Sequence, residues 1–139
     1  MKACQELGLQ QRFFNSEFSR SSINNGYQLA RDLFSKPLDY TAILAFNDEI
    51  AYRIINTFRT AHVKIPKDIS LMGFDHIRKY VPYHAPLTSI FCAQEYNIGE
   101  IAVDLLLERI TNPDMPKQAR VLPVKIYNEG TTGAPRKLL

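Results

Sequence analysis

The sequence has few of the features that mark extracellular and membrane proteins. It contains no tryptophan and only two cysteines, Cys4 and Cys92, which lie far apart in the chain. Such isolated thiols favour a reduced intracellular protein over a disulfide framework. No apolar run approaches the roughly 20 residues of a membrane-spanning helix, and the first residues lack the apolar core of a signal peptide. The sequence therefore predicts a cytoplasmic protein without a membrane anchor.

The chain also lacks a strong excess of either charge. Its 17 lysines and arginines against 14 aspartates and glutamates give a net charge of +3, and the basic residues are scattered. This pattern is not the electrostatic footprint of a nucleic-acid-binding surface, so any contact with DNA requires residues outside this sequence. With 139 residues, 45% of them hydrophobic, the chain can form one folded domain without a metal or a disulfide.

Motifs of catalysis and metal binding are absent as well. The sequence has no G-x-S-x-G elbow, no glycine-rich phosphate loop ending in Gly-Lys, and no H-E-x-x-H. The three histidines, His62, His76 and His84, do not have metal-ligand spacing on one element. We therefore expect neither an enzyme nor a cofactor or metal site.

The chain does contain an alternation of short apolar runs and helical periods. Apolar runs predict strands at 11–14, 41–46, 69–74, 87–91 and 120–128, and helical spacing predicts helices over 23–34, 47–58 and 96–110. The continuous run at 41–46 predicts a strand buried on both faces. Residues 76–86 are expected to form a loop, and the tail after residue 128 to fray. The alternation predicts the α/β class, with a mostly parallel sheet flanked by helices.

The predicted helix over 96–110 differs from the others in its apolar surface. Apolar residues recur at 98, 101, 102, 105, 106 and 110, and Val103 and Leu107 widen the apolar arc. An arc of this width indicates burial on more than one side. We therefore expect this helix to pack against another lobe or another copy of the chain.

Ligands of parallel sheets bind beyond the carboxyl ends of the strands. There the sequence places the group around Glu17 and Phe18, the pair Asn47 and Asp48, and Asp75 with its neighbour His76. An amide and a carboxylate can bridge adjacent hydroxyls of a sugar, and an aromatic ring can cover its apolar face.

Structural roles are open for the same residues. Asn47 is equally suited to an N-cap and Asp48 to the helix dipole. Asp75 can cap a turn, and Phe18 can belong to the core. Residue types alone do not decide between these roles.

Several stretches of the chain, taken in order, resemble one known family. They are TAILAFNDEIAYRIINTFRTAHVKIPKDISLMGFDHI, then PLTSI followed by YNIGEIAVDLLLERI, and the closing VLPVKIYNEGTTGAP. The upstream stretch EFSRSSINNGYQLARDLF, which contains Phe18, is similar more loosely. Over residues 9–135 the chain resembles the effector-binding domain of the lactose-repressor/galactose-repressor family of bacterial transcription regulators. This resemblance implies a periplasmic-binding-protein-like fold of type I.

The resemblance also implies roles for particular residues. Asn47 and Asp75 match family positions that hydrogen-bond the effector, Phe18 matches the aromatic residue that stacks on it, and Gln94 falls where a further contact is expected. His76 departs from the family pattern, which has a second aspartate there. The implied partners are a small-molecule effector, commonly a sugar or sugar phosphate, a second copy in a homodimer or larger assembly, and DNA bound through a domain not in this chain.

The implied organisation is that of a partial domain. Residues 1–139 would be its C-terminal part, with a lobe at 9–91 and 120–135 and the helix at 96–110 packed on a first lobe or a partner chain. The implied function is effector sensing, in which binding shifts lobe closure and dimer geometry. One alternative is a periplasmic sugar-binding protein of a transport system. A weaker one is a receiver domain phosphorylated on Asp75.

Overall fold

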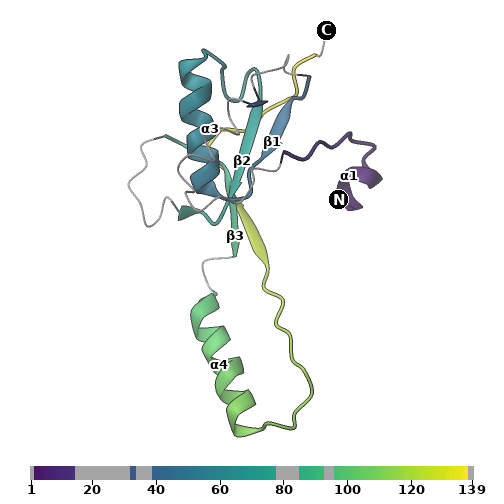
Figure 1. Ribbon diagram of the computed structural model, residues 1–139, viewed down its shortest axis with the longest axis vertical. Coiled ribbons are helices and arrows are strands. Elements are labelled where there is room, and N and C mark those ends of the chain that lie inside the picture. The colour runs from purple at the N-terminus through teal and green to yellow at the C-terminus, as the bar shows by residue number, and fades with distance from the viewer. Residues whose placement is uncertain (1, 15–31, 34–38, 78–84, 93–95, 138–139) are drawn as a thin grey trace.

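The computed structural model of the chain is an α/β structure in which the helices at 2–6 and 98–111 stand apart from the sheet (Figure 1). It describes residues 2–14, 32–33, 39–77, 85–92 and 96–137. The elements in chain order are α1 (Lys2–Glu6), β1 (Ala42–Leu44), α3 (Asp48–Thr60), β2 (Ser70–Phe74), β3 (Ser89–Cys92), α4 (Ile98–Thr111) and β4 (Val124–Tyr127). Within the described residues, no helix is long and apolar enough to cross a membrane.

The four strands form one sheet in the order β1-β2-β3-β4. β1 pairs with β2 and β2 with β3 in parallel, whereas β3 pairs with β4 in antiparallel register. The prediction of a mostly parallel sheet with helices is therefore confirmed. The predicted helix over 23–34 lies outside the described residues except for Asp32 and Leu33.

The core lies between α3 and the parallel strands. Asn47 caps α3, and the buried side chains Ala51, Ile54 and Phe58 recur at helical spacing. They pack in one cluster with residues of the strands, among them Leu71. Full burial of a side chain the size of Ile54 or Phe58 contributes about 1.5–3 kcal/mol relative to exposure. This burial fixes the N-terminus of α3 against the sheet.

Two predictions for the first strands were wrong. The run at 11–14 forms no strand, and Phe13 is 71% exposed, because these residues join no ladder with a described strand. β1 is not buried on both faces, since Leu44 is 69% exposed. β1 pairs only with β2 among the described strands, and α3 lies on one side of the sheet (Figure 1).

The C-terminal segment also departs from prediction. The last strand begins at Val124 because Pro123, which has no N–H, cannot donate to the ladder before it. The tail is not frayed. Thr131 is buried, its hydroxyl donates to the carbonyl oxygen of Leu71 at 2.7 Å, and the amide of Thr88 donates to that hydroxyl at 2.8 Å. The tail is thus hydrogen-bonded both to β2 and to the residue that precedes β3, which closes this end of the sheet.

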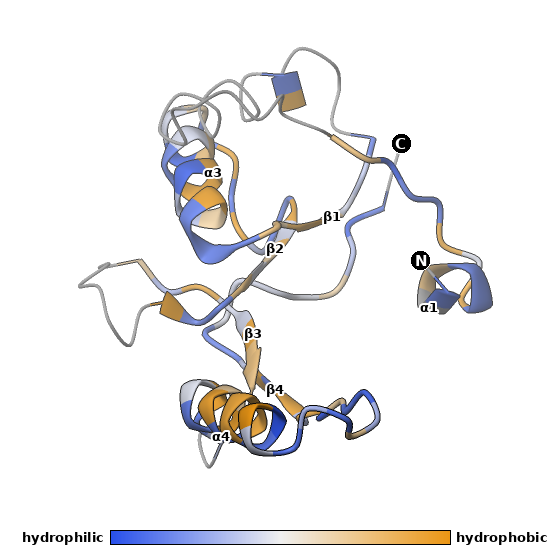
Figure 2. Cartoon of the chain, turned by 60° about the horizontal axis from the view of Figure 1, so that its bottom comes forward, coloured by the Kyte–Doolittle hydropathy of each residue, from blue (hydrophilic) through white to orange (hydrophobic). Residues whose placement is uncertain are grey.

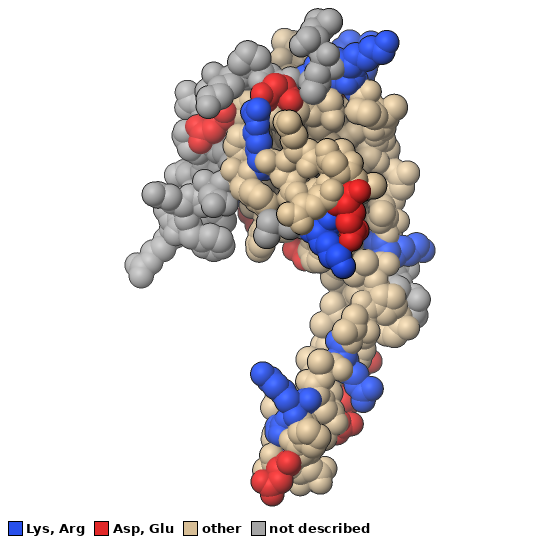
Figure 3. Space-filling view, turned by 90° about the vertical axis from the view of Figure 1, so that its right-hand side faces the viewer, with Lys and Arg blue, Asp and Glu red and all other residues tan. Residues whose placement is uncertain are grey.

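Residues 96–127 form an extension that we call the α4 arm. It projects from the body of the molecule (Figures 1 and 3), and Figure 1 shows α4 descending and residues 112–123 returning to β4. No residue of α4 is buried. In Figure 2, much of α4 and β4 has the orange colour of hydrophobic residues. The exposed large apolar side chains of the arm are Tyr96, Ile98, Val103, Leu106, Leu107, Ile110, Val121, Val124 and Ile126.

Candidate functional site

The parallel strands bring two of the four predicted effector residues to one edge of the sheet. Leu44 pairs with Met72 in parallel register, so the chain leaves β1 and β2 at the same edge. Asn47 follows β1 after two residues, and Asp75 follows β2 directly. Phe18 and Gln94 lie outside the described residues. We call this edge, with Asn47 and Asp75, the strand-end site.

Asn47 caps α3, as its position before an apolar stripe predicts. Its backbone is extended, with φ −149° and ψ 172°, and its Oδ1 accepts a hydrogen bond from the amide of Ile50 at 3.0 Å. The cap engages only the oxygen of the side-chain amide, and the nitrogen of that amide can donate two hydrogen bonds. Capping and ligand binding can therefore use different atoms of the same side chain.

Asp75 and His76 form a left-handed turn at the end of β2. Their φ values are 95° and 50°, which residues other than glycine rarely adopt. The amide of Asp75 donates to the carbonyl oxygen of Ile90 at 2.9 Å. The ring of His76 stacks on Tyr127, with centroids 4.0 Å apart and planes 15° from parallel. The turn is thus held against β3 and β4.

Asp48 has a larger role than the helix dipole suggested. It is 1% exposed, and its carboxylate accepts hydrogen bonds from the hydroxyl of Ser89 at 2.6 Å and the amide of Ile77 at 2.8 Å. Burial raises the pKa of Asp48, and the nearby charge of Asp75 acts in the same direction, whereas these two hydrogen bonds and His76 act against it. The sequence placed Asp48 at this edge and suited it to the helix dipole, but it did not predict the burial of the carboxylate or its bonds to Ser89 and Ile77.

One signal in the sequence could have indicated a buried group here. Gly73 lies inside β2, where a glycine often marks the close approach of another atom. A Cβ atom added at Gly73 would collide with Oδ1 of Asp48. The glycine therefore makes the space that the carboxylate fills.

Aromatic side chains precede both polar residues of the strand-end site. Phe46, before Asn47, is 78% exposed, and Phe74, before Asp75, is 43% exposed. Sequence reasoning placed the aromatic contact at Phe18 and missed Phe46, because the run at 41–46 has the pattern of a buried strand. The ring of Phe46 is therefore an exposed apolar surface at the same sheet edge as Asn47.

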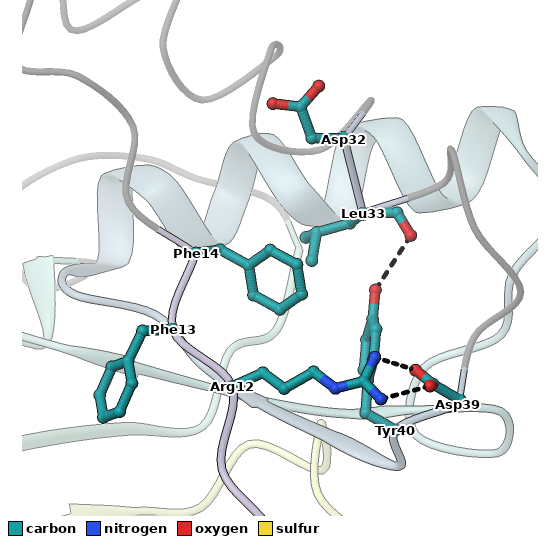
Figure 4. A pocket seen from close by; sticks show the side chains of 7 residues that line it. All are labelled: Arg12, Phe13, Phe14, Asp32, Leu33, Asp39 and Tyr40. Carbon is teal, nitrogen blue, oxygen red and sulfur yellow. Dashed lines mark hydrogen bonds and ion pairs between the residues drawn. The ribbon is translucent and has the colours of Figure 1, made fainter.

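A separate pocket of about 280 Å³ lies near the opposite end of β1 (Figure 4). It is lined by Arg12, Phe13, Phe14, Asp32, Leu33, Asp39 and Tyr40. Arg12 donates to both carboxylate oxygens of Asp39, at 2.7 and 2.5 Å, so its charge is already paired. Burial raises the pKa of Tyr40 to about 12, and its hydroxyl donates to the carbonyl oxygen of Leu33. Because Tyr40 precedes β1, this pocket is distinct from the strand-end site.

Comparison with known proteins identifies the family. Residues 1–132 match the periplasmic binding protein-like domain. The chain belongs to this family. The ribose operon repressor of Escherichia coli K12 is 32% identical over 108 residues, which are 78% of this chain and 32% of that protein.

Two solved structures with bound ribose are also similar to the chain. Both are LacI family transcriptional regulators. The one from Enterococcus faecalis V583 is 31% identical with a TM-score of 0.73, and the match covers 97% of this chain and 48% of that regulator's chain. The one from Enterococcus faecium is 27% identical with a TM-score of 0.75, and the match covers 98% of this chain and 49% of that regulator's chain.

These comparisons confirm the resemblance to the lactose-repressor/galactose-repressor regulators and the periplasmic-binding-protein-like fold. The chain spans about a third of the length of the curated relative and about half of each solved chain. Within the described residues, no three His, Cys, Asp or Glu side chains are placed to hold a metal ion.

Proposed function

We propose that this chain is the C-terminal part of the effector-binding domain of a transcriptional regulator and that its strand-end site senses a sugar. The observation that carries this proposal is the parallel register that brings Asn47 and Asp75 to one sheet edge, where Phe46, the residue before Asn47, is exposed. An amide and a carboxylate offer the donors and acceptors that adjacent sugar hydroxyls require. The aromatic ring offers a surface for the C–H face of the sugar.

The mechanism is a shift between two arrangements of lobes. The sugar binds between this edge and a first lobe outside the chain, with Phe18 and Gln94 completing the contacts. It favours the closed arrangement and thereby changes the geometry of a dimer that binds DNA through a separate domain. We assign the chain no reaction and no cofactor, and we place the regulator in the cytoplasm.

Two arguments narrow the proposal. The relatives reported above are transcriptional regulators, which favours sensing over transport and over a phosphorylated receiver. Ribose is bound in both solved relatives, and the carboxylate of Asp75 repels a phosphate group. We therefore expect a neutral sugar of the ribose type and not a sugar phosphate.

The test is an NMR titration of the chain with ribose, and with ribose 5-phosphate for comparison. We expect ribose to shift the amide resonances of Asn47 and Asp75. Asn47→Ser keeps a capping oxygen but removes the amide, and Asp75→Asn removes the charge, so each should weaken ribose binding about tenfold or more. Asn97→Ser is the matched control, because Asn97 caps α4 in the same way away from the site.

Outcomes that contradict the proposal are equally definite. If ribose and other neutral pentoses and hexoses leave all resonances unchanged at millimolar concentrations, the chain has no sugar site of its own. If Asn97→Ser weakens binding as much as Asn47→Ser, the effect belongs to helix capping and not to the amide of Asn47.

We further propose that the chain is a homodimer or a larger assembly. The apolar side chains of the α4 arm remain exposed on the described surface. A contiguous apolar face of this kind marks a protein interaction site. In the intact regulator we assign this face to a first lobe, and in the isolated chain to a second copy.

A further inference from the structure

We propose that Asp48 and Ser89 form a brace that positions Asp75 for the effector. In this role Asp48 is a positioning residue that does not touch the sugar. The inference rests on the proposed function for its ligand, but the brace itself is a property of the chain and can be tested without any sugar.

The brace consists of three hydrogen bonds. The hydroxyl of Ser89 donates to Oδ1 of Asp48 at 2.6 Å, and the amide of His76 donates to that hydroxyl at 3.1 Å. The amide of Ile77 donates to Oδ2 of Asp48 at 2.8 Å. Two consecutive amides directly after Asp75 are thus tied, one through Ser89 and one directly, to a single buried carboxylate.

The backbone of the turn needs such a restraint. Asp75 and His76 both have positive φ, a region in which residues other than glycine are strained. A strained turn persists only where its surroundings fix it. The hydrogen bond that the amide of Asp75 donates to the carbonyl oxygen of Ile90 holds one side of the turn, and the brace holds the other.

The brace also links the two halves of the strand-end site. Asp48 is the residue after Asn47 at the N-terminus of α3, so its carboxylate joins the element that carries the amide to the turn that carries the Asp75 carboxylate. Both Asp48 and Ser89 are 1% exposed, which leaves no room for either to contact a ligand directly. We therefore assign to Asp48 and Ser89 the role of setting the distance between the Asn47 amide and the Asp75 carboxylate.

The test compares two hydroxyl deletions on the same strand segment. Ser89→Ala removes the link from His76 to Asp48. Thr88→Val is the matched control, because Thr88 is equally buried but its hydroxyl accepts from the amides of Glu129 and Thr131, away from the turn. For each variant, amide hydrogen exchange and the three-bond HN–Hα couplings of Asp75 and His76 are measured, together with ribose affinity by NMR.

We expect Ser89→Ala to speed exchange of the His76 and Ile77 amides, to change both couplings and to weaken ribose binding about tenfold. Thr88→Val should lower stability without these effects. Combining Ser89→Ala with Asp75→Asn should cost no further affinity beyond Asp75→Asn alone, because the brace acts through Asp75.

Three results would overturn the brace. The first is that amide exchange and couplings are unchanged in Ser89→Ala, and the second is that Thr88→Val changes them equally. The third is that Ser89→Ala lowers ribose affinity by the same factor in the parent chain and in the Asp75→Asn variant. If ribose does not bind the parent chain, the proposed function fails, and exchange and couplings alone decide whether the brace positions Asp75.

Discussion

At the scale of single residues, Asn47 shows how one side chain can serve the fold and the site together. Its oxygen caps α3 through the amide of Ile50, so its replacement by alanine would cost about 1 kcal/mol in stability whatever the ligand. An alanine scan would therefore confuse capping with binding. Only substitutions that keep a capping oxygen separate the two roles.

Asp48 makes the stability of the chain depend on pH in a definite direction. Because burial raises its folded-state pKa above the usual value of 3.8, its contribution to stability is present below that value and is lost as pH rises through the folded-state pKa. Asp48→Asn lacks this dependence. We expect the free energy of unfolding of the parent, relative to Asp48→Asn, to increase from pH 7 to pH 4.

Urea unfolding of both proteins at several pH values measures this difference. The comparison cancels the titration of every other group to the extent that the variant leaves those groups unchanged. A parent that instead loses stability relative to Asp48→Asn on acidification would show that the hydrogen bonds to the carboxylate outweigh its burial.

At the scale of elements, local patterns predicted what local forces determine. The apolar stripe and cap of α3, the strands at 70–74 and 89–92 and the helix at 98–111 were all expected near their observed bounds. The strand at 11–14 was not found and β1 was exposed on one face, because pairing and burial depend on neighbours that the local pattern does not contain. For the same reason, Asn47 and Asp75 were predicted from topology, whereas the brace of Asp48 and Ser89 was not.

The tail provides a test of such a non-local contact. Thr131→Val removes the hydroxyl that joins Leu71 to Thr88 and leaves a buried amide and a buried carbonyl without that partner. We expect a loss of about 1–3 kcal/mol in the free energy of unfolding. Thr132→Val, at the next and less buried position, should change it by less than about 0.5 kcal/mol. Equal effects in urea unfolding would mean that the tail does not close the sheet.

At the scale of the whole molecule, the same pair of strands, β3 and β4, holds both the strand-end site and the α4 arm. The ring of His76 stacks on Tyr127 of β4, and β4 is the strand by which the arm returns to the body. The antiparallel pair of β3 and β4 connects the turn at Asp75 to the base of the arm. A partner seated on the arm and a ligand at the site can therefore influence each other through this pair, as the proposed effector sensing requires.

The exposed face of the α4 arm predicts self-association of the isolated chain. Light scattering at tens of micromolar should give the mass of a dimer or more. Leu106 is 58% exposed on the stripe that includes Val103 and Ile110, so Leu106→Lys should shift the chain towards monomer, because a charge cannot be buried there without a partner. Glu108→Lys introduces the same side chain on another side of α4 and should leave the mass unchanged. A monomeric parent would contradict the prediction, and an equal effect of both variants would assign association to net charge and not to the apolar face.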